Sequence, residues 1–253
     1  MTQTPPHPHA AIRAAHEVSG QDTATLGRDD LSPIIAREGW PVIGVLFLMA
    51  LAISAICHWF LPRPVGLPIS AIGLLVVLWS LWFFRDPPRV APAGALFVAP
   101  ADGVVCAVGP AVPPPELGFP GPVPRISIFM DIFSVHVNRA PCQATVQAVH
   151  YRPGKFFNAS FDKASEHNER CSLRLALPDG RSAACIQIAG LIARRIVCRV
   201  KPGDALRTGQ RFGMIRFGSR VDVYLPADVA PAVALGQKTI AGRTILAAAP
   251  ETH

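Results

Sequence analysis

A glycine followed by a serine, Gly218-Ser219, lies in the run Phe217-Gly218-Ser219-Arg220 between two apolar segments. Glycine has no side chain to shield its carbonyl and tolerates strained backbone angles. The Ser219 hydroxyl could therefore attack the Gly218 carbonyl and exchange the amide for an ester. Elimination across that ester would leave a dehydroalanine, whose hydrolysis gives ammonia and a pyruvoyl group at the new amino terminus. Such a ketone is an electron sink that can hold an amine substrate as a Schiff base, much as pyridoxal phosphate does.

The dipeptide alone is weak evidence, because most Gly-Ser pairs form ordinary turns. Other runs with chemically distinctive residues precede it along the chain. They are Phe83-Phe-Arg-Asp-Pro-Pro-Arg89, Ala99-Pro-Ala-Asp-Gly-Val-Val105, Val135-His-Val-Asn-Arg-Ala-Pro141 and Gly154-Lys-Phe-Phe-Asn-Ala-Ser-Phe-Asp-Lys-Ala-Ser-Glu-His-Asn-Glu-Arg170.

Taken in order, these runs and Phe217-Gly218-Ser219-Arg220 resemble the motifs of phosphatidylserine decarboxylases of the short bacterial and archaeal branch, over about residues 83 to 225. The resemblance implies a precursor that cleaves itself between Gly218 and Ser219 and carries a covalent pyruvoyl cofactor (pyruvate) derived from Ser219. It also implies decarboxylation of phosphatidylserine to phosphatidylethanolamine. The expected assembly is a heterodimer of the two cleavage fragments, with or without further oligomerisation.

Self-cleavage needs a base for the Ser219 proton and a group that orients this base. His136 and Asp102 are candidates by residue type, since a carboxylate, an imidazole and a serine form a familiar triad that is recognised by geometry. Pro100-Ala-Asp-Gly103 is equally a good turn sequence, in which Asp102 would bond to its own backbone. The resemblance favours the catalytic alternative, because the aspartate of the family's Pro-Ala-Asp-Gly motif belongs to its autocleavage triad.

The long branch of the family carries two histidines three residues apart, and this chain departs from that pattern. His136 takes the first position and Arg139 the second. Either His136 serves both maturation and decarboxylation, or another group is the base for cleavage. Arg139, Lys155 and Lys163 are candidates for binding the substrate carboxylate or phosphate, since Arg offers a planar fork and Lys a point charge. Each could instead be an ordinary solvated or structural charge.

Two apolar segments, Pro41 to Cys57 and Val65 to Phe84, have no Asp, Glu, Lys or Arg and are close to the length needed to span a bilayer. They predict a membrane hairpin, with a buried helical hairpin of a soluble domain as the alternative. Arginines precede and follow the pair, while the connecting loop has only Arg63. The positive-inside bias therefore predicts a protein of the cell membrane whose catalytic domain lies on the cytoplasmic side.

The net charge of +7 suits an anionic membrane surface and its acidic lipid headgroups. It would also suit nucleic acid, but the chain has no nucleic-acid-binding motif. The six cysteines are scattered without a Cys-x-x-Cys pair, so neither a zinc site nor a disulfide framework is indicated.

From Leu96 onward, short apolar or alternating runs are separated by Pro and Gly, which predicts an all-β or β-dominated sandwich or barrel. The predicted organisation is a flexible segment over residues 1–36, a membrane-anchoring helical hairpin over 37–89 and a decarboxylase domain over 90–253. The rival interpretation is a membrane-tethered, carrier-like β-sandwich binding domain that keeps Gly218-Ser219 intact as a hairpin turn. A carrier, however, presents a lysine at its hairpin tip, and this tip has none.

Overall fold

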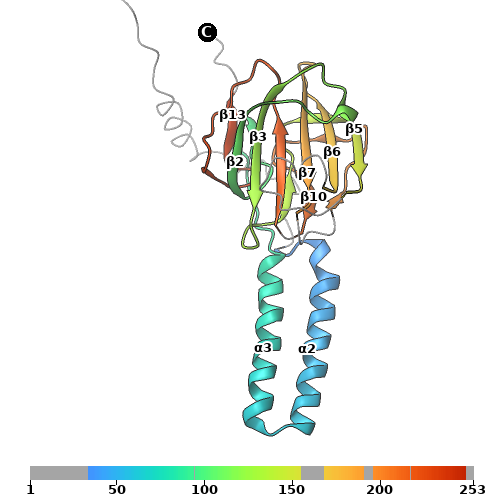
Figure 1. Cartoon of the computed structure of the whole chain (residues 1–253), viewed down its shortest axis with the longest axis vertical. Helices are drawn as coiled ribbons and strands as arrows, with labels where there is room; N and C mark the ends of the chain where they lie inside the picture. Colours follow the sequence, from blue (N-terminus) through green and yellow to red (C-terminus); the bar gives the residue numbers. More distant parts are fainter. Residues whose placement is uncertain (1–33, 94, 155–167, 191–195, 217, 249–253) are drawn as a thin grey trace, which may run out of the picture.

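The computed structural model describes residues 34–93, 95–154, 168–190, 196–216 and 218–248. A short 3-10 helix, η3 (Arg37–Gly39), leads into two long helices, α2 (Trp40–Phe60) and α3 (Arg63–Phe83). The two helices run side by side away from a β-domain (Figure 1). Most of the predicted flexible segment lies outside the described residues.

The helical hairpin is long and apolar enough to cross a membrane. Its two candidate spans, Arg37–Phe60 and Arg63–Phe83, have mean hydropathies of 2.3 and 2.0, and only 11% and 17% of their apolar windows are buried. Small residues line the contact between the helices, as is common in membranes. A Cβ on Gly73 would lie 3.2 Å from the Cβ of Ala50, and the hydroxyls of Ser54 and Ser70 are 2.9 Å apart. Because so little of this apolar surface is buried, the hairpin differs from a core helix pair and indicates membrane association.

The ends of the hairpin are tied to the β-domain. The Ala36 amide donates to the Phe84 carbonyl at 2.8 Å, and the Asp86 amide donates to the Ile34 carbonyl at 2.8 Å. Phe83 and Phe84 are buried in a cluster with residues of the β-domain, including Val137 and Met214. The segment that leaves α3 is therefore part of the packed domain.

Three sheets form the β-domain, and the largest is a curled half-barrel of eight strands. Its spatial order is β12-β2-β3-β11-β7-β6-β5-β9. These strands span, in the same order, Lys238–Thr239, Gly103–Ala111, Val123–Met130, Ser219–Tyr224, Ser182–Ile188, Arg170–Ala176, Ala144–Arg152 and Ala205–Leu206. A three-stranded sheet has the order β4-β10-β8 (Val137–Arg139, Arg211–Ile215, Ile196–Cys198), and β1 pairs with β13 (Ala95–Val98, Ile245–Ala248).

The central strands β7 and β11 of the curled sheet are buried on both faces, whereas β2 and β5 are partly exposed. The concave side carries the main core, to which β3 contributes Ile126, Ile128 and Met130 and β11 contributes Val221 and Val223. The alternation of these residues follows the period of two expected for strands. The other face is covered by the segment around η4 (Pro115–Leu117), where Leu117 packs against apolar residues of β7 and β11.

The prediction of a β-dominated domain with an N-terminal helical pair is confirmed. Nine apolar runs from Leu96 onward each overlap a strand. They are residues 96–99, 104–108, 125–129, 144–151, 171–176, 183–188, 196–200, 213–217 and 221–224. The four strands that the sequence pattern missed are β4, β9, β12 and β13, each of two to four residues. Such short pieces do not display a period.

Candidate functional site

Gly218 and Ser219 lie where the chain crosses from one sheet to another. Strand β10 ends at Ile215 in the three-stranded sheet, and Ser219 begins β11 in the eight-stranded sheet. The two strands therefore do not form the plain hairpin of the carrier-like interpretation. Gly218 has a φ of +55°, in the left-handed region, and a Cβ built there would meet nothing within 4 Å. Glycine is thus suited to this position by its backbone angle.

Ser219 is fully buried and faces Met130, its partner in the register of β11 and β3. Its Oγ lies 3.4 Å from the Met130 Sδ, which is a weak acceptor. Water is therefore excluded from the immediate surroundings of the hydroxyl, as a controlled backbone rearrangement would require.

Two buried side-chain amides, those of Asn138 and Gln187, continue the contacts of Met130. The Asn138 Nδ2 is 3.7 Å from the Met130 Sδ, and the Asn138 Oδ1 accepts a hydrogen bond of 2.8 Å from the Gln187 Nε2. A side chain at Gly213 would collide with this network, because its Cβ would lie 2.8 Å from the Gln187 Nε2. The sequence did offer a signal for Gln187, which is the polar residue in the apolar strand Ala183 to Ile188. Asn138 lies within a motif but was not singled out.

His136 is fully buried and lies beside the strand that leads to Gly218. Its carbonyl accepts a hydrogen bond of 3.3 Å from the Ile215 amide, and its ring lies 4.3 Å from that of Phe83 between centroids. Burial lowers the pKa of His136 to about 4, against the opposing effect of the Ser134 backbone, while the charge of Arg85 lowers it further. The imidazole is therefore neutral at physiological pH, and its lowered pKa makes it a weaker base than a solvent-exposed histidine.

Asp102 is held by two partners from distant parts of the chain. Its carboxylate forms a two-pronged ion pair with Arg89, one bond being 2.7 Å from the Arg89 Nη2 to the Asp102 Oδ2. The Ala241 amide also donates to the Asp102 Oδ1 at 2.7 Å, and Arg89 donates to the Ala241 carbonyl at 3.0 Å. The negative charge of Asp102 is close enough to His136 to raise its pKa, although less than burial lowers it. Sequence reasoning used Arg89 only as a positive charge after the hairpin and gave it no role in the site.

Arg139 has structural partners. Its Nη2 donates to the Asp86 Oδ1 at 3.0 Å and to the Pro87 carbonyl at 3.1 Å, and its Nη1 donates to the Gly209 carbonyl at 3.1 Å. Burial lowers the pKa of this guanidinium, and Asp86 opposes that effect. The guanidinium therefore ties the segment after α3 to the β-domain. Lys155 and Lys163 lie outside the described residues.

Asn168 and Glu169, at the end of the longest motif, brace neighbouring loops. The Asn168 Nδ2 donates to the Ala189 carbonyl at 2.7 Å, and the Glu169 Oε1 accepts from the Ile196 amide at 3.4 Å. Both contacts join the start of β6 to its neighbours, at the end of β7 and the start of β8.

These features define a β-domain with a long apolar helical hairpin, in which a serine is buried at a crossing between two sheets and a buried imidazole bonds through its backbone to the strand that leads to this crossing. The sequence profile of the phosphatidylserine decarboxylase family matches residues 77–247. The chain belongs to this family and is a decarboxylase.

Relatives from three bacteria carry the name phosphatidylserine decarboxylase proenzyme. The protein of Paramagnetospirillum magneticum is 54% identical over 215 residues, which cover 84% of this chain and 86% of the relative. That of Cereibacter sphaeroides is 59% identical over 182 residues, covering 71% and 78% of the two chains. That of Oleidesulfovibrio alaskensis is 51% identical over 218 residues, covering 86% and 95%. The similarity therefore includes the β-domain and reaches into the hairpin.

Proposed function

We propose that this chain is a precursor that cleaves itself between Gly218 and Ser219 and then decarboxylates phosphatidylserine to phosphatidylethanolamine. The observation that carries the proposal is the burial of Ser219 directly after a left-handed glycine, at a crossing between sheets. The names of the relatives support both the substrate and the processing, since they are proenzymes of phosphatidylserine decarboxylase.

In the proposed maturation, the Ser219 Oγ attacks the Gly218 carbonyl carbon, and the amide becomes an ester. Loss of the proton on the Ser219 Cα breaks the ester bond, so that Gly218 keeps a carboxylate and residue 219 becomes a dehydroalanine. Addition of water and loss of ammonia then leave a ketone at the start of the fragment 219–253. The residues present fit this group, because Ser219 is enclosed by Met130 and lies next to the open space at Gly218.

When formed, the pyruvoyl group supplies an electron sink for the charge that develops as carbon dioxide leaves. His136 is the proposed proton-transfer residue, because it is an imidazole whose backbone bonds to Ile215, at the end of the strand that leads to Gly218. Its lowered pKa keeps the ring neutral at physiological pH. Asp102 is proposed to act on His136 through its charge, while Arg89 and Ala241 fix the carboxylate. Arg139, Lys155 and Lys163 remain proposed substrate-binding residues, although Arg139 would have to exchange a present partner for the substrate.

The hairpin is proposed to hold the site at the cytoplasmic face of the cell membrane, where the lipid headgroup is presented. Arg28 and Arg37 precede the hairpin and Arg85 and Arg89 follow it, whereas Arg63 alone lies in its loop. This distribution supports cytoplasmic ends. Proteolysis of the β-domain in right-side-out vesicles, with protection in inside-out ones, would reverse the proposed topology.

The decisive experiment is the intact mass of purified, active protein under denaturing conditions. We expect two chains, residues 1–218 and 219–253, the second with a pyruvoyl terminus. Ser219→Ala should remain a single chain without decarboxylase activity, while the matched control Ser127→Ala, which removes another buried serine hydroxyl, should cleave. A fully active uncleaved chain would refute self-cleavage. An uncleaved chain without lipid turnover would instead favour the carrier-like alternative.

A further inference from the structure

We propose that the loop Asp131–Ser134, which joins β3 to the segment before β4, is a third membrane contact beside the two helices. Ile132 and Phe133 would enter the interface of the anionic phospholipid leaflet that receives the hairpin. Both side chains are exposed to solvent in the described structure, Ile132 to 39% and Phe133 to 60%. We refer to this segment as the 131–134 loop.

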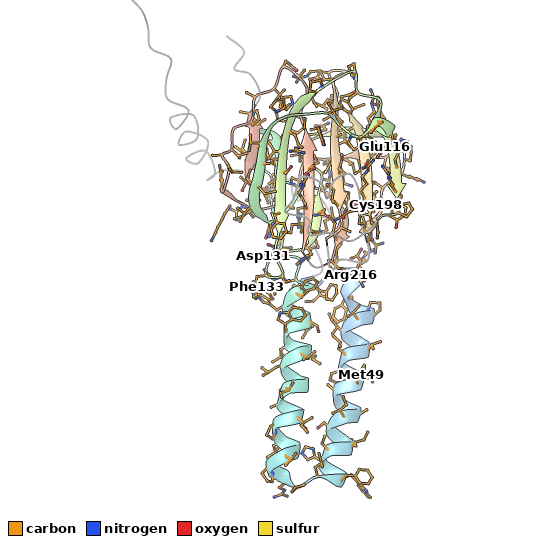
Figure 2. All side chains as sticks on the ribbon, in the orientation of Figure 1. Met49, Glu116, Asp131, Phe133, Cys198 and Arg216 are labelled. Atoms are coloured by element: carbon orange, nitrogen blue, oxygen red, sulfur yellow. The ribbon has the colours of Figure 1, made fainter. Side chains whose placement is uncertain are left out.

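The 131–134 loop lies at the end of the β-domain from which the helices emerge. Figure 2 shows Asp131 and Phe133 close to the domain end of α3. The ring of Phe133 makes an edge contact with Trp82 in the last turn of α3, with centroids 6.1 Å apart. Trp82 is itself 41% exposed, and tryptophan favours the membrane interface. The exposed aromatic surface at the end of α3 therefore extends onto the loop.

The loop is held in a shape that presents its apolar tip. The Asp131 Oδ1 accepts hydrogen bonds from the amides of Phe133 and Ser134, at 2.8 and 2.9 Å, and from the Ser134 hydroxyl at 3.0 Å. These bonds occupy the carboxylate and order the turn before any contact is made. An ordered loop loses less conformational entropy on binding than a flexible one.

Arg85 places a positive charge on this surface, close enough to the carboxylate of Asp131 to interact with it. Its guanidinium stacks 3.9 Å above the Trp82 ring and donates to the Phe133 carbonyl at 2.7 Å. A cation at the interface next to exposed aromatic rings matches a negatively charged headgroup above an acyl chain. This chemistry favours a lipid leaflet over a protein partner as the occupant.

The loop also connects two parts of the candidate site. Met130, which contacts Ser219, precedes it directly, and His136 follows it by two residues. The depth of the loop in the leaflet would therefore set the height of the site above the headgroups. This consequence rests on the proposed function, whereas the membrane contact itself does not.

Photo-crosslinking of the unaltered chain tests the contact without reference to activity. The protein is reconstituted in phosphatidylglycerol vesicles with a lipid that carries a diazirine near the top of its acyl chain. We expect label on Ile132 or Phe133 in the tryptic peptide 126–139, and none in peptide 221–238, whose Leu235 is 71% exposed. If the helices were labelled but peptide 126–139 were not, the loop contact alone would be overturned. Unlabelled helices and loop would overturn insertion of the hairpin as well.

Activity with two forms of substrate provides the second test. Phe133→Ser should lower turnover of phosphatidylserine in vesicles roughly three- to tenfold, since it removes an apolar anchor. Turnover of a monomeric short-chain phosphatidylserine should stay unchanged, Phe133→Leu should restore the vesicle activity, and the control Leu235→Ser should change neither. Equal losses with both substrates would indicate a structural role and overturn the proposal, as would unchanged vesicle activity. Absence of any decarboxylation by the unaltered chain would instead refute the proposed function, leaving the crosslinking result to decide the loop.

Discussion

The Oγ of Ser219 and the Sδ of Met130 face each other at 3.4 Å across β11 and β3, in the interior of the β-domain. A thioether is a weak acceptor and cannot take up the hydroxyl proton. It can hold the rotamer of Ser219 while leaving the hydroxyl available for attack on the preceding carbonyl.

Met130→Leu tests this relationship with little change in volume. We expect the precursor's free energy of unfolding to fall by less than about 1.5 kcal/mol, as is usual for such exchanges. Self-cleavage should slow by roughly two- to tenfold, in line with the loss of about one hydrogen bond that orients the serine. Gel analysis of cleavage during refolding and thermal unfolding of a Ser219→Ala precursor measure the two effects. Unchanged cleavage would show that Met130 only packs.

The hydrogen bond between the buried side chains of Gln187 and Asn138 predicts non-additive effects in a double-mutant cycle. Gln187→Leu leaves the buried Asn138 Oδ1 without its donor and should lower the free energy of unfolding by roughly 1–3 kcal/mol. Combining it with Asn138→Leu should cost less than the sum of the two single changes, because both polar groups are then removed. Urea unfolding in the Ser219→Ala background provides the four free energies. If the two effects on the free energy of unfolding were strictly additive, Gln187 and Asn138 would not be energetically coupled.

Arg89 should matter for maturation although it is not a candidate proton-transfer residue. Arg89→Ala leaves the Asp102 carboxylate without its two-pronged partner and should lower the cleavage rate severalfold. Arg89→Lys should recover part of the rate, because it keeps the charge but loses the fork. Arg181→Ala is a matched control, since its ion pairs with Asp179 and Asp228 are on the surface. Equal rates in Arg89→Ala and the unaltered chain would contradict the positioning of Asp102 by Arg89.

His136 should make the folded precursor less stable as the pH falls. Its folded pKa of about 4 lies below the unfolded value near 6.5, mainly because of burial. The unfolded chain therefore binds the proton first, so stability is fully present above about pH 6.5 and declines as the pH falls towards 4. His136→Phe in the Ser219→Ala precursor should flatten this part of the pH dependence of the unfolding temperature. An unchanged slope would assign the acid sensitivity to other groups.

The same residue should be required for chemistry. If His136 serves both steps, His136→Ala should cleave slowly or not at all, and cleavage should be assayed on gels separately from carbon dioxide release. Normal maturation without decarboxylation would restrict the imidazole to the substrate step. Normal maturation with normal turnover would remove His136 from the mechanism.

The sequence predicted the elements better than it predicted their contacts. Apolar runs with a clear period revealed the hairpin and nine strands, because each run must bury one or both faces. The pairings of Arg89 with Asp102 and of Arg139 with Asp86 join residues that no local pattern connects. Gln187 was detectable in principle as a polar residue in an apolar strand. Its partner Asn138 depends on sheet order, which is a long-range property.

Strand β11 lies between β3 and β7 near the middle of the eight-stranded sheet, β12 is the edge strand beside β2, and β13 pairs with β1. All three strands lie within residues 219–248, so a cut between Gly218 and Ser219 would leave the smaller chain interwoven with the larger one. The fragments should then melt together as one cooperative unit. Once separated, they could regain the native state only by a concentration-dependent association of two chains, where the precursor needed a single folding event. Maturation would thus convert a protein that can refold by itself into one whose lifetime is set by its rate of unfolding.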